Sequence, residues 1–574
     1  MFNRTFLFLF LLLLFSSCSY RAGSVINPSL DFNSLHIYED LSYPTTPTGK
    51  ILDSARSAGT NYITMLNNGD DALLARIHLI RLAKKSIFLQ TFILKFDESG
   101  RFVVNELIEA AKRGVKVKII ADYLTTTKDL GMVAYLTKAH PNLEIKLYNP
   151  VSNNITPSKF ALIKKLSFDF RNFNQRMHNK VLVVDDFMSI TGGRNYANDY
   201  FDRGTERNFK DRDVLVIGPA VKKMTDSFSE YWHYPLSVSS ADMFDVQRLI
   251  GNEPANKNSQ GLNTGFGELF KELINCESDE GCIEERLIRG GAMVDNVEFI
   301  ADSPGKRGKI GQHKLTRSPY ELARFLHQAQ ESIVMQTPYL VIGKKESKFF
   351  KKLAKDNPCM EFFVSSNSLA AADHIHAYAF SYKNKKKYLK KFRWQIFELK
   401  PQPKDNDLIV SPVNKEDRDK NYFTCIHAKT YVVDRKKVWV GSFNLDPRSA
   451  NLNTEVGLIV DDERIAQAVE ADIRRDMANQ NSWTIGKRKE IPVISHFSGL
   501  LGNIVRAIPV FDLWPFTYSG SFELKDGKEK LPFFHEDFYE NYNYVGPFPG
   551  VHLTEKEIKA RLIKAFFGPV EPLI

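Results

Sequence analysis

Two stretches of the chain carry the same pattern of polar residues, and this repeat constrains the fold more than any other feature. Residues 176–195 are RMHNKVLVVDDFMSITGGRN, and residues 425–444 are CIHAKTYVVDRKKVWVGSFN. The two histidines, His178 and His427, are 249 positions apart (427 − 178), and each is followed by Lys at +2, Asp at +7, Gly at +14 and Asn at +17. Two matches in one register, inside similar apolar runs, indicate an internal duplication.

The scaffold around the motifs is repeated as well. In DALLARIHLIRLAKKSIFLQTFIL, apolar residues recur at helical spacing up to Ala83, and a β-rich run begins at Ser86. The segment YELARFLHQAQESIVMQTPYLV restates this pattern, with Ser332 in the place of Ser86. Between these segments, VVNELIEAAKRGVKVKIIADY predicts a helix that stops at Gly114 and a buried strand over 115–121. Helices that alternate with apolar strands predict an α/β fold.

The length of the chain allows two domains of ordinary size, each with its own core. The segment YPTTPTGK is typical of a tether, and GNEPANKNSQGLNTG is typical of a linker or a long surface loop. The predicted organisation is a signal peptide (1–17), a tether (18–55), a first half (56–255), a linker (256–292), a second half (293–484) and a C-terminal extension (485–574).

The N-terminus has the features of a secretory signal. Arg4 precedes a short apolar run over 6–15, and Ser16 and Ser17 lead to Cys18. The segment FSSC resembles the lipobox of bacterial lipoproteins, which implies that Cys18 is lipidated and becomes the new N-terminus. The expected location is the bacterial cell envelope, with the protein anchored to a membrane on the periplasmic side. An ordinary signal peptide and an uncleaved anchor are the alternatives.

Charge and cysteine content narrow the class of partner and compartment. The net charge is +10, which favours anionic partners, either nucleic acid, anionic lipid or phosphorylated substrates, without choosing among them. Cys276 and Cys282 are close enough in sequence to pair in an oxidising compartment. The paired CxxC pattern of structural zinc sites is absent from the sequence.

The motif spacing predicts which side chains face one another. Side chains two apart in a strand share a face, so His178 and Lys180 point the same way. His427 and Lys429 do the same in the second motif. Residues seven apart fall on opposite faces. The motif acids, Asp185 and Asp434, are therefore expected to point away from the histidines and toward the scaffold.

Two such units facing one another suit a phosphodiester. Lysines neutralise its charge, and the amides of Asn195 and Asn444 donate to its non-bridging oxygens. Gly193 and Ser442 are small, which lets a phosphate approach the backbone. One neutral histidine can attack phosphorus, while the other, protonated, donates to the leaving oxygen. We expect neither a metal nor another cofactor, because the cationic side chains supply the electrophilic role.

These residues resemble the signature of the phospholipase D superfamily, His-x-Lys-x4-Asp followed by Gly-[Gly/Ser]-x-Asn, and both copies are complete. The resemblance implies two duplicated α/β/α halves with one shared active site at their pseudo-twofold interface. It also implies a covalent phosphohistidine intermediate, for which family analogy favours His178 as the nucleophile. An acidic residue is expected to orient each histidine. Alignment of RDVLVIG with TEVGLIV offers Asp213 and Glu455.

The chain is more closely similar to bacterial cardiolipin synthases of the subgroup without long N-terminal transmembrane helices. The segments SNSLAAADHIHAYAFSYKNKKKYLKK, FELKP and GSFNLDPRSANLNTEVGLIV carry this resemblance. It implies a phosphatidyltransferase that acts on anionic phospholipids at a membrane surface. Phosphatidylglycerol is the first substrate candidate, and phosphatidylethanolamine is the second.

Three other functions are compatible with parts of the sequence. They are a hydrolytic phospholipase D that releases phosphatidic acid, a nuclease or other phosphodiesterase of the same superfamily, and a non-catalytic lipid-binding scaffold. Complete motifs argue against the scaffold, and a lipid anchor argues against the nuclease, so nucleic acid is not the expected partner. Sequence does not separate transfer from hydrolysis, and it does not give the oligomeric state.

Four further features have two interpretations each. His374 and His376 are either surface residues or cleft residues, and Cys425 is either a buried apolar residue or part of the site. The basic run over 383–393 is either a solvated helix face or a surface for anionic headgroups. The apolar segment over 496–516 either packs on the core or contacts a membrane.

Overall fold

The computed structural model describes residues 43, 46–126, 129–252, 270–306, 316–410, 422–488 and 518–551. All of these belong to one compact unit, Tyr43–Ile574. Cys18 and the apolar segment over 496–516 lie outside the described residues.

The first half is built on a nine-stranded sheet in the order β10-β1-β8-β6-β5-β2-β3-β4-β9. β2, β3 and β4 are parallel to one another, and all other neighbours in this sheet are antiparallel. The strands are β1 (Asn61–Leu66), β2 (Ser86–Thr91), β3 (Lys116–Asp122), β4 (Leu143–Tyr148), β5 (Val181–Val184), β6 (Met188–Gly192), β8 (Asp213–Ile217), β9 (Ser237–Ser239) and β10 (Ala292–Val294).

The second half repeats this plan in a ten-stranded sheet with the order β11-β18-β17-β16-β12-β13-β14-β19-β20-β21. Its three central strands β12, β13 and β14 are again parallel, and β16 and β17 stand where β5 and β6 stand in the first sheet. The expected duplication of an α/β fold is confirmed. The strands are β11 (Val297–Ala301), β12 (Ser332–Gln336), β13 (Glu361–Asn367), β14 (Gln395–Leu399), β16 (Thr430–Val433), β17 (Lys437–Gly441), β18 (Val456–Asp461), β19 (Ser482–Lys487), β20 (Ser519–Leu524) and β21 (Tyr542–Gly546).

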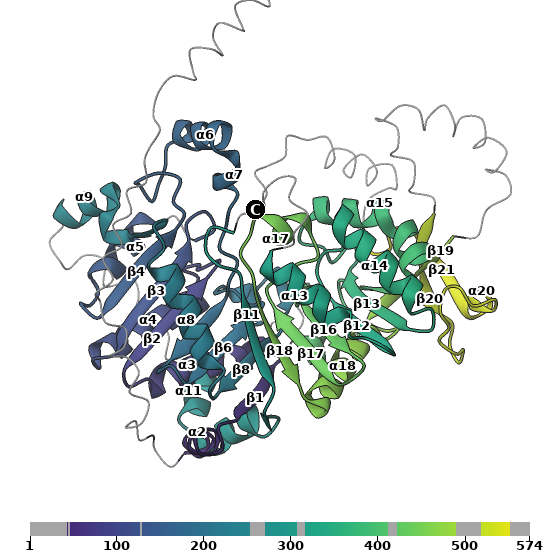
Figure 1. Ribbon diagram of the computed structural model, residues 1–574, viewed down its shortest axis with the longest axis horizontal. Helices are drawn as coiled ribbons and strands as arrows, with labels where there is room; N and C mark the ends of the chain where they lie inside the picture. The colour runs from purple at the N-terminus through teal and green to yellow at the C-terminus, as the bar shows by residue number, and fades with distance from the viewer. Residues whose placement is uncertain are drawn as a thin grey trace, which may run out of the picture. The chain divides into compact units, whose positions relative to one another are not determined.

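Helices cover both faces of the sheets (Figure 1). The helices of the first half are α2 (Pro47–Ala58), α3 (Gly69–Leu82), α4 (Glu98–Lys112), α5 (Leu130–Lys138), α6 (Lys159–Phe168), α7 (Phe170–Phe173), α8 (Val221–Trp232) and α9 (Phe244–Asn252), with short turns η2 (Asn198–Tyr200) and η3 (Ser240–Asp242). Those that follow are α11 (Lys271–Glu277), α12 (Glu280–Ile283), η5 (Glu284–Ile288), α13 (Arg317–Leu326), α14 (Lys344–Asp356), α15 (Ile375–Phe392), α16 (Asn406–Ile409), α17 (Pro447–Asn451), α18 (Glu463–Asp476) and α20 (Phe538–Asn541).

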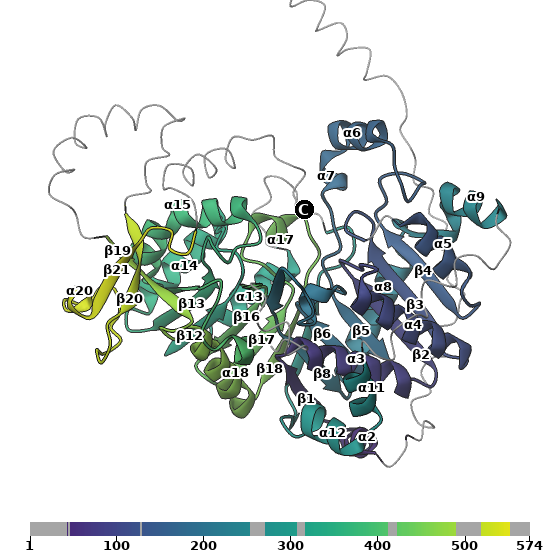
Figure 2. The same cartoon turned by 180° about the vertical axis from the view of Figure 1, so that it is seen from behind.

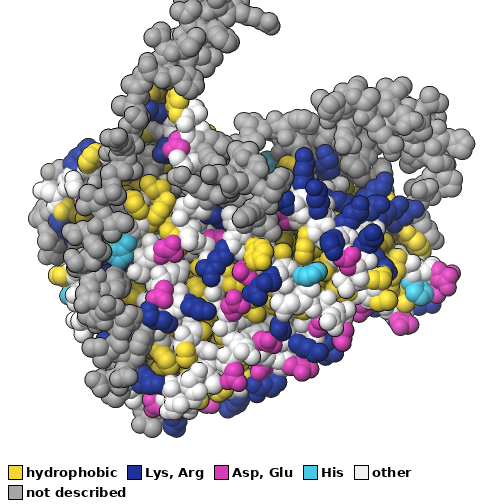
Figure 3. Space-filling view, viewed as in Figure 1, with side chains coloured by type: hydrophobic (Ala, Val, Ile, Leu, Met, Phe, Trp, Pro, Cys, Tyr) yellow, Lys and Arg dark blue, Asp and Glu magenta, His cyan; other side chains and the backbone are white. Residues whose placement is uncertain are grey.

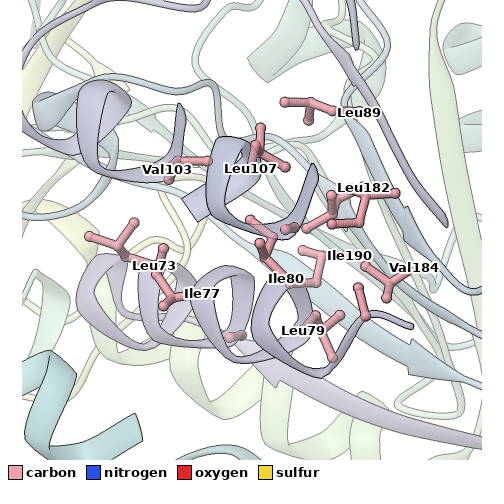
Figure 4. Packing of buried hydrophobic residues seen from close by; sticks show 14 of the residues in the cluster. Leu73, Ile77, Leu79, Ile80, Leu89, Val103, Leu107, Leu182, Val184 and Ile190 are labelled. Carbon is pink, nitrogen blue, oxygen red and sulfur yellow. The ribbon is translucent and has the colours of Figure 1, made fainter. Parts of the chain in front are cut away.

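Each half has an outer apolar core of its own, and a third, shared core joins the two halves. In the first half, α3 and α4 pack on the sheet, as Figure 4 shows for Leu73, Ile77, Leu107 and Leu182. The shared core combines residues of α8, such as Phe228, with residues of α18 and of both sheets. Because this apolar cluster is continuous, burial fixes the two halves against each other.

Local sequence explains where the elements of the first half begin and end. Asp97 caps α4 by accepting from the backbone N–H of Gly100, and Gly114 follows the helix at φ 99°, which an L residue rarely adopts. β3 then runs over Lys116–Asp122, one residue later than the strand predicted over 115–121. Its apolar residues are buried because helices cover both faces of the parallel strands.

The boundaries of the halves differ from the predicted ranges. α2 lies partly within the expected tether and buries Leu52 and Ala55 in the first core. The predicted linker contains α11 and α12, which are joined by a disulfide between Cys276 and Cys282, and β10 at its end pairs with β1. β20 and β21, from the expected C-terminal extension, continue the second sheet. No helix in the described ranges is both long and apolar enough to cross a membrane.

Candidate active site

Both histidine motifs lie at the boundary between the halves. His178 and Lys180 immediately precede β5, and His427 and Lys429 immediately precede β16, so these residues are just outside the strands in which the sequence placed them. All four side chains are buried.

The backbone of each motif is held by the opposite half. His178 N–H donates to Thr454 O at 3.0 Å, and Thr454 N–H donates back to Arg176 O at 2.9 Å. In the other direction, β15 (Phe423–Ile426) pairs in parallel with β7 (Arg207–Lys210), and His427 N–H donates to Lys210 O at 2.8 Å. The backbone of each histidine is therefore held by a segment of the other half, which is an isolated bridge at Thr454 for His178 and the end of β7 for His427.

The side chain of each histidine also bonds to a residue of the other half. His178 Nδ1 lies 2.8 Å from Glu455 Oε2, and His427 Nδ1 lies 2.6 Å from Asp211 Oδ2. A carboxylate at Nδ1 fixes the tautomer in which Nε2 carries the lone pair, so each ring presents Nε2 as its reactive atom. The contact of Glu455 with a histidine agrees with expectation, whereas the acid beside His427 is Asp211.

The expectation for Asp213 is wrong. Asp213 lies 2.9 Å from Arg76 Nη2 and accepts from the backbone N–H of Arg194, and it neutralises the guanidinium of Arg76. The strand register explains the error. Gly192 pairs with Asp213 and Gly441 pairs with Gly457, so Asp211 is the true counterpart of Glu455. A shift of two residues keeps every side chain on its face, so the apolar pattern could not detect it.

Gly193 and Ser442 contact the two orienting carboxylates. A Cβ at Gly193 would collide with the carboxylate of Asp211. In the equivalent place, Ser442 Oγ donates to Glu455 Oε2 at 2.5 Å. The small residue in each motif thus leaves room for the acid that holds the histidine of the other half, and its expected contact with phosphate remains a proposal.

The two motif asparagines differ in their surroundings. Asn195 Oδ1 accepts from the backbone N–H of Ile93 at 3.2 Å. Asn444 is buried, and its Oδ1 has no hydrogen-bond partner among the described residues. An unpaired buried amide oxygen is costly, so Asn444 is poised to gain a partner when a ligand or water occupies the site.

The motif acids lie away from the histidines, as predicted. Asp185 accepts from the backbone N–H groups of Lys84, Lys85 and Ser86, each at 2.8 Å, at the start of β2. Asp434 accepts in the same way from Ser332 N–H at 2.9 Å, at the start of β12. These hydrogen bonds fix the scaffold strands, and a catalytic role for Asp185 and Asp434 as part of the repeated motif remains a prediction.

Burial changes the protonation of the two lysines. Lys180 Nζ donates to His178 O at 2.8 Å and lies 5.1 Å from the centre of the Phe92 ring. Lys429 Nζ lies 3.1 Å from His427 Nε2. Burial lowers the pKa of Lys180 to about 7 and the pKa of Lys429 to about 8. An incoming phosphate would favour the charged form of both.

The histidines and their acids are not equivalent electrostatically. Burial and the nearby lysines lower the pKa of His178 well below its usual value and that of His427 to about 4. The charge of His427, together with the cations around it, holds the pKa of Asp211 well below its usual range despite burial. Burial raises the pKa of Glu455 to about 7. The pair His427–Asp211 is thus better suited to hold an imidazolium.

Aromatic side chains that the motif does not include shape the site. Phe92 packs edge-on against the ring of His178 with centroids 4.7 Å apart, and Tyr200 packs in the same way against His427 at 5.1 Å. Arg448 donates to Asn174 Oδ1, and its charge contributes to the lowered pKa of His178. None of these contacts is signalled by sequence spacing, because each partner comes from a different element.

The structure also shows the surroundings of Cys425 and His374, for which the sequence left two interpretations each. Cys425 is fully buried beside Tyr200 and Phe209, as an apolar residue. The side chain of His374 is 46% exposed at the start of α15. Within the described ranges, no cluster of three or more His, Cys, Asp or Glu side chains could hold a metal ion.

Geometry and charge together suit the binding of a phosphodiester. Two imidazoles, fixed at Nδ1 by carboxylates, and two lysines meet where the duplicated halves join. Such a site can bind a phosphate anion, attack phosphorus with one Nε2 and protonate a leaving oxygen with the other. This is the architecture of the phospholipase D class.

Comparison with known proteins indicates the same class. The family described as "Cardiolipin synthase, PLD-like domain" matches residues 76–232 and 322–477. Cardiolipin synthase C of Escherichia coli (strain K12) is 31% identical over 70% of this chain and 81% of its own length. An uncharacterised protein of Helicobacter pylori (strain ATCC 700392 / 26695) is 31% identical over 76% of this chain and 84% of its own length. The chain belongs to the cardiolipin synthase-like family of the phospholipase D superfamily.

Among solved structures, the chain is similar to the phosphatidylserine synthase of Haemophilus influenzae Rd KW20. It has 15% sequence identity to this chain, with a TM-score of 0.49, and the match covers 79% of this chain and 97% of that one.

Proposed function

We propose that the protein is a phosphatidyltransferase that forms cardiolipin by transferring the phosphatidyl group of one phosphatidylglycerol to the free hydroxyl of another. Membership of the cardiolipin synthase-like family supports the reaction class. The observation that carries the proposal is the exchange of acids between the halves, with Glu455 on His178 and Asp211 on His427.

The unequal acids assign the roles of the two histidines. Asp211, with its lowered pKa, is ionised, and together with a bound phosphate anion it stabilises an imidazolium at His427, whose pKa burial and Lys429 otherwise lower to about 4. This makes His427 the general acid. His178 lies beside Glu455, whose pKa is raised, so the His178 ring is the less easily protonated of the two. No described residue hydrogen-bonds to His178 Nε2, and this nitrogen is the nucleophile.

In the first step, His178 Nε2 attacks phosphorus and the bond from phosphorus to the glycerol headgroup oxygen breaks. His427 Nε2 gives its proton to that oxygen, so that glycerol leaves and a phosphatidyl-histidine remains. Lys180 and Lys429 neutralise the charge on the non-bridging oxygens, and both have a pKa that a bound phosphate would raise again.

In the second step, the hydroxyl of a second phosphatidylglycerol takes the place of the departed glycerol. His427, now neutral, accepts the hydroxyl proton as the oxygen attacks phosphorus. The bond from phosphorus to His178 Nε2 breaks, and cardiolipin is released. Water in place of the lipid hydroxyl would give phosphatidic acid, so exclusion of water decides between transfer and hydrolysis.

Product analysis tests this function. Purified protein is incubated with vesicles of labelled phosphatidylglycerol, with and without phosphatidylethanolamine, and the products are identified by mass. The proposal predicts cardiolipin and free glycerol from phosphatidylglycerol alone. Phosphatidic acid as the sole product at every acceptor density would instead establish a hydrolase.

We further propose that Cys18 is the mature, lipidated N-terminus and that it anchors the enzyme to an envelope membrane on the periplasmic side. The support is Arg4, the apolar run over 6–15 and the segment FSSC. Stable anchoring requires more than one acyl chain. Mass spectrometry of the native N-terminus should find a di- or triacylated Cys18, and an intact Met1 or cleavage elsewhere would refute this anchor.

A further inference from the structure

Helix α6 exposes three large apolar side chains and buries none of its residues. The exposed fractions are 75% for Phe160, 61% for Ile163 and 80% for Phe168. Positions i, i+3 and i+8 lie on one side of an α-helix, so the three apolar side chains share a face, on which Lys164 and Ser167 lie between them. Single exposed apolar residues are common, but three large ones on the same side of a ten-residue helix indicate an interaction surface.

The position of α6 links this face to the candidate active site. Ser158 caps the helix, and the chain continues through α7 to His178, ten residues beyond Phe168 (178 − 168). Between them, Asn174 Oδ1 accepts from Arg448, and Gln175 Nε2 donates to Lys306 O at 3.0 Å. These bonds tie the end of the α6–α7 segment to the second half, close to the nucleophile.

The charges around the apolar face have one predominant sign. Lys159 and Lys164 are exposed on α6, and Lys165 pairs with Asp169 at the end of the helix. Large apolar side chains with lysines among and beside them match the interfacial region of an anionic bilayer, because a lysine can extend its ammonium group to the negative headgroups above the acyl chains.

A second basic surface lies along the same edge of the molecule. Figures 1 and 2 both draw α6 and α15 at this edge, on either side of the junction between the halves. Figure 3 shows Lys and Arg side chains gathered over α14 and α15. A shallow groove between these helices is lined by Lys351, Lys383, Lys386, Lys387, Lys390 and Lys391.

Helix α15 also begins beside the site. Asp373, two residues before the helix, accepts from Tyr339 OH at 2.7 Å. Its charge acts on His427, where it opposes the lowering of the pKa that burial and Lys429 cause. On its outer side, Phe380 is 43% exposed and precedes the lysines. Apolar and basic side chains thus lie on both sides of the junction of the halves along this edge, on α6 in the first half and on α15 in the second.

We propose that this edge docks on an anionic lipid bilayer, with Phe160, Ile163 and Phe168 inserted among the acyl chains and the lysines of α15 on the headgroups. The inference rests on the proposed function only in taking a membrane lipid as the substrate. A second copy of the chain suits this edge less well, because it would bring lysines against lysines. Docking in this orientation places the junction of the halves over the lipid that it processes.

A local probe on α6 tests the orientation independently of any N-terminal anchor. Ile163→Cys in a Cys359→Ser background is labelled with an environment-sensitive dye, and the signal of the Cys359→Ser parent is subtracted. The control is the unchanged chain labelled at Cys359, which is exposed and lies before β13, at the end of that strand remote from His427. Vesicles of phosphatidylglycerol with phosphatidylcholine should shift the emission of the α6 dye to the blue and leave the Cys359 dye unchanged.

Three other results would overturn the proposal. An α6 dye that stays in water while the protein floats with the vesicles would show a different docking surface. A blue shift without vesicles that grows with protein concentration would show that a second copy covers α6. A dye that is shielded at all concentrations without vesicles would show that another segment of this chain covers it.

A triple variant separates docking from catalysis. Phe160→Ser, Ile163→Ser and Phe168→Ser should lower turnover of vesicle phosphatidylglycerol at least about tenfold. Turnover of a short-chain, monomeric phosphatidylglycerol should not change, because the helix buries none of its residues. The matched control, Leu408→Ser with Phe534→Ser, also removes exposed apolar side chains and should affect neither substrate. Equal losses on both substrates would contradict docking through α6, whereas a wild-type protein inactive on both would contradict only the proposed function.

Discussion

His427 and Asp211 are 216 residues apart in the sequence, and their side chains meet at 2.6 Å across the boundary between the two halves. The pair His178–Glu455 makes the same contact in the opposite direction at 2.8 Å. Neither half can therefore orient its own histidine, and the duplicated chain holds one site in place of two.

Asp211 and Asp213 should respond differently to the loss of charge. Asp211→Asn should lower kcat by at least about a hundredfold with little effect on KM, because the imidazolium of His427 loses its counter-charge. Asp213→Asn should instead lower the free energy of unfolding by about 3 kcal/mol, since it leaves the buried Arg76 without its carboxylate. Kinetics and thermal unfolding of both variants make the comparison, and the reverse outcome would restore the aligned acid, Asp213.

Both histidines should be required by one site. His178→Ala and His427→Ala should each reduce turnover by at least about a thousandfold and leave the unfolding temperature unchanged. His233→Ala is the matched control, because His233 is an exposed residue at the end of α8. If either single variant kept about half of the wild-type rate, the two motifs would act as separate sites.

The rate should have a bell-shaped dependence on pH, with limbs that belong to the coupled groups of the site. The acid limb of kcat/KM should lie below pH 6.5, because burial and nearby lysines lower the pKa of His178, which must be neutral to attack phosphorus. The lysines are charged only below their pKa, so the alkaline limb should lie where Lys180 (about 7) and Lys429 (about 8) lose their protons.

Lys429→Arg provides the check on this assignment, because arginine keeps its charge across the whole range. Whatever the absolute rate of the variant, its alkaline limb should move to higher pH. An alkaline limb that stays in place would assign that limb to another group.

The carboxylate of Asp472 should make the stability of the joined halves depend on pH in the acid range. It lies on α18 and pairs with Arg212 and Lys210 of the first half, and these cations hold its pKa well below the usual value. A lowered pKa contributes stability that is present above about pH 4 and lost as the pH falls further. Asp472→Asn should lower the free energy of unfolding by about 3 kcal/mol at pH 7.

Unfolding of this variant should also depend less on pH between about 4 and 2 than unfolding of the wild type. Asp356→Asn is the control, because Asp356 forms an exposed pair with Lys352 and should have no measurable effect. Wild-type sensitivity to acid in Asp472→Asn would assign the effect to other carboxylates.

The features of the fold and site that depend on periodicity and repetition could be predicted from the sequence. The spacing from His178 to Asn195 and from His427 to Asn444 predicted the duplication, and the phase of a strand turned Asp185 and Asp434 toward the scaffold. Periodicity of two could not separate Asp211 from Asp213, because both occupy the same face. The register of β6 with β8 separates them, and that register depends on pairing between distant segments.

Tertiary contacts account for the rest of what sequence missed. The sequence of α6 gives no sign that Phe160 and Phe168 lack a core to pack on, because apolar residues of a helix are ordinarily buried. Phe92 and Tyr200 carry no motif and are brought to the histidines by the strands and turns that precede them. In the same way, α2 was hidden in a Pro- and Thr-rich segment, and its burial depends on the core beneath it.

Trapping the covalent intermediate tests the central claim most directly, namely that one histidine of a shared site carries the phosphatidyl group while the other transfers the proton. Wild-type protein and the variants His178→Ala and His427→Ala are mixed with phosphorus-labelled phosphatidylglycerol, quenched with denaturant at neutral pH, and digested for peptide mass analysis. We predict label on the peptide containing His178 in the wild type and none in His178→Ala. Label on His427 in the wild type would reverse the assignment of roles, and label on both peptides, each independent of the other histidine, would contradict the shared site.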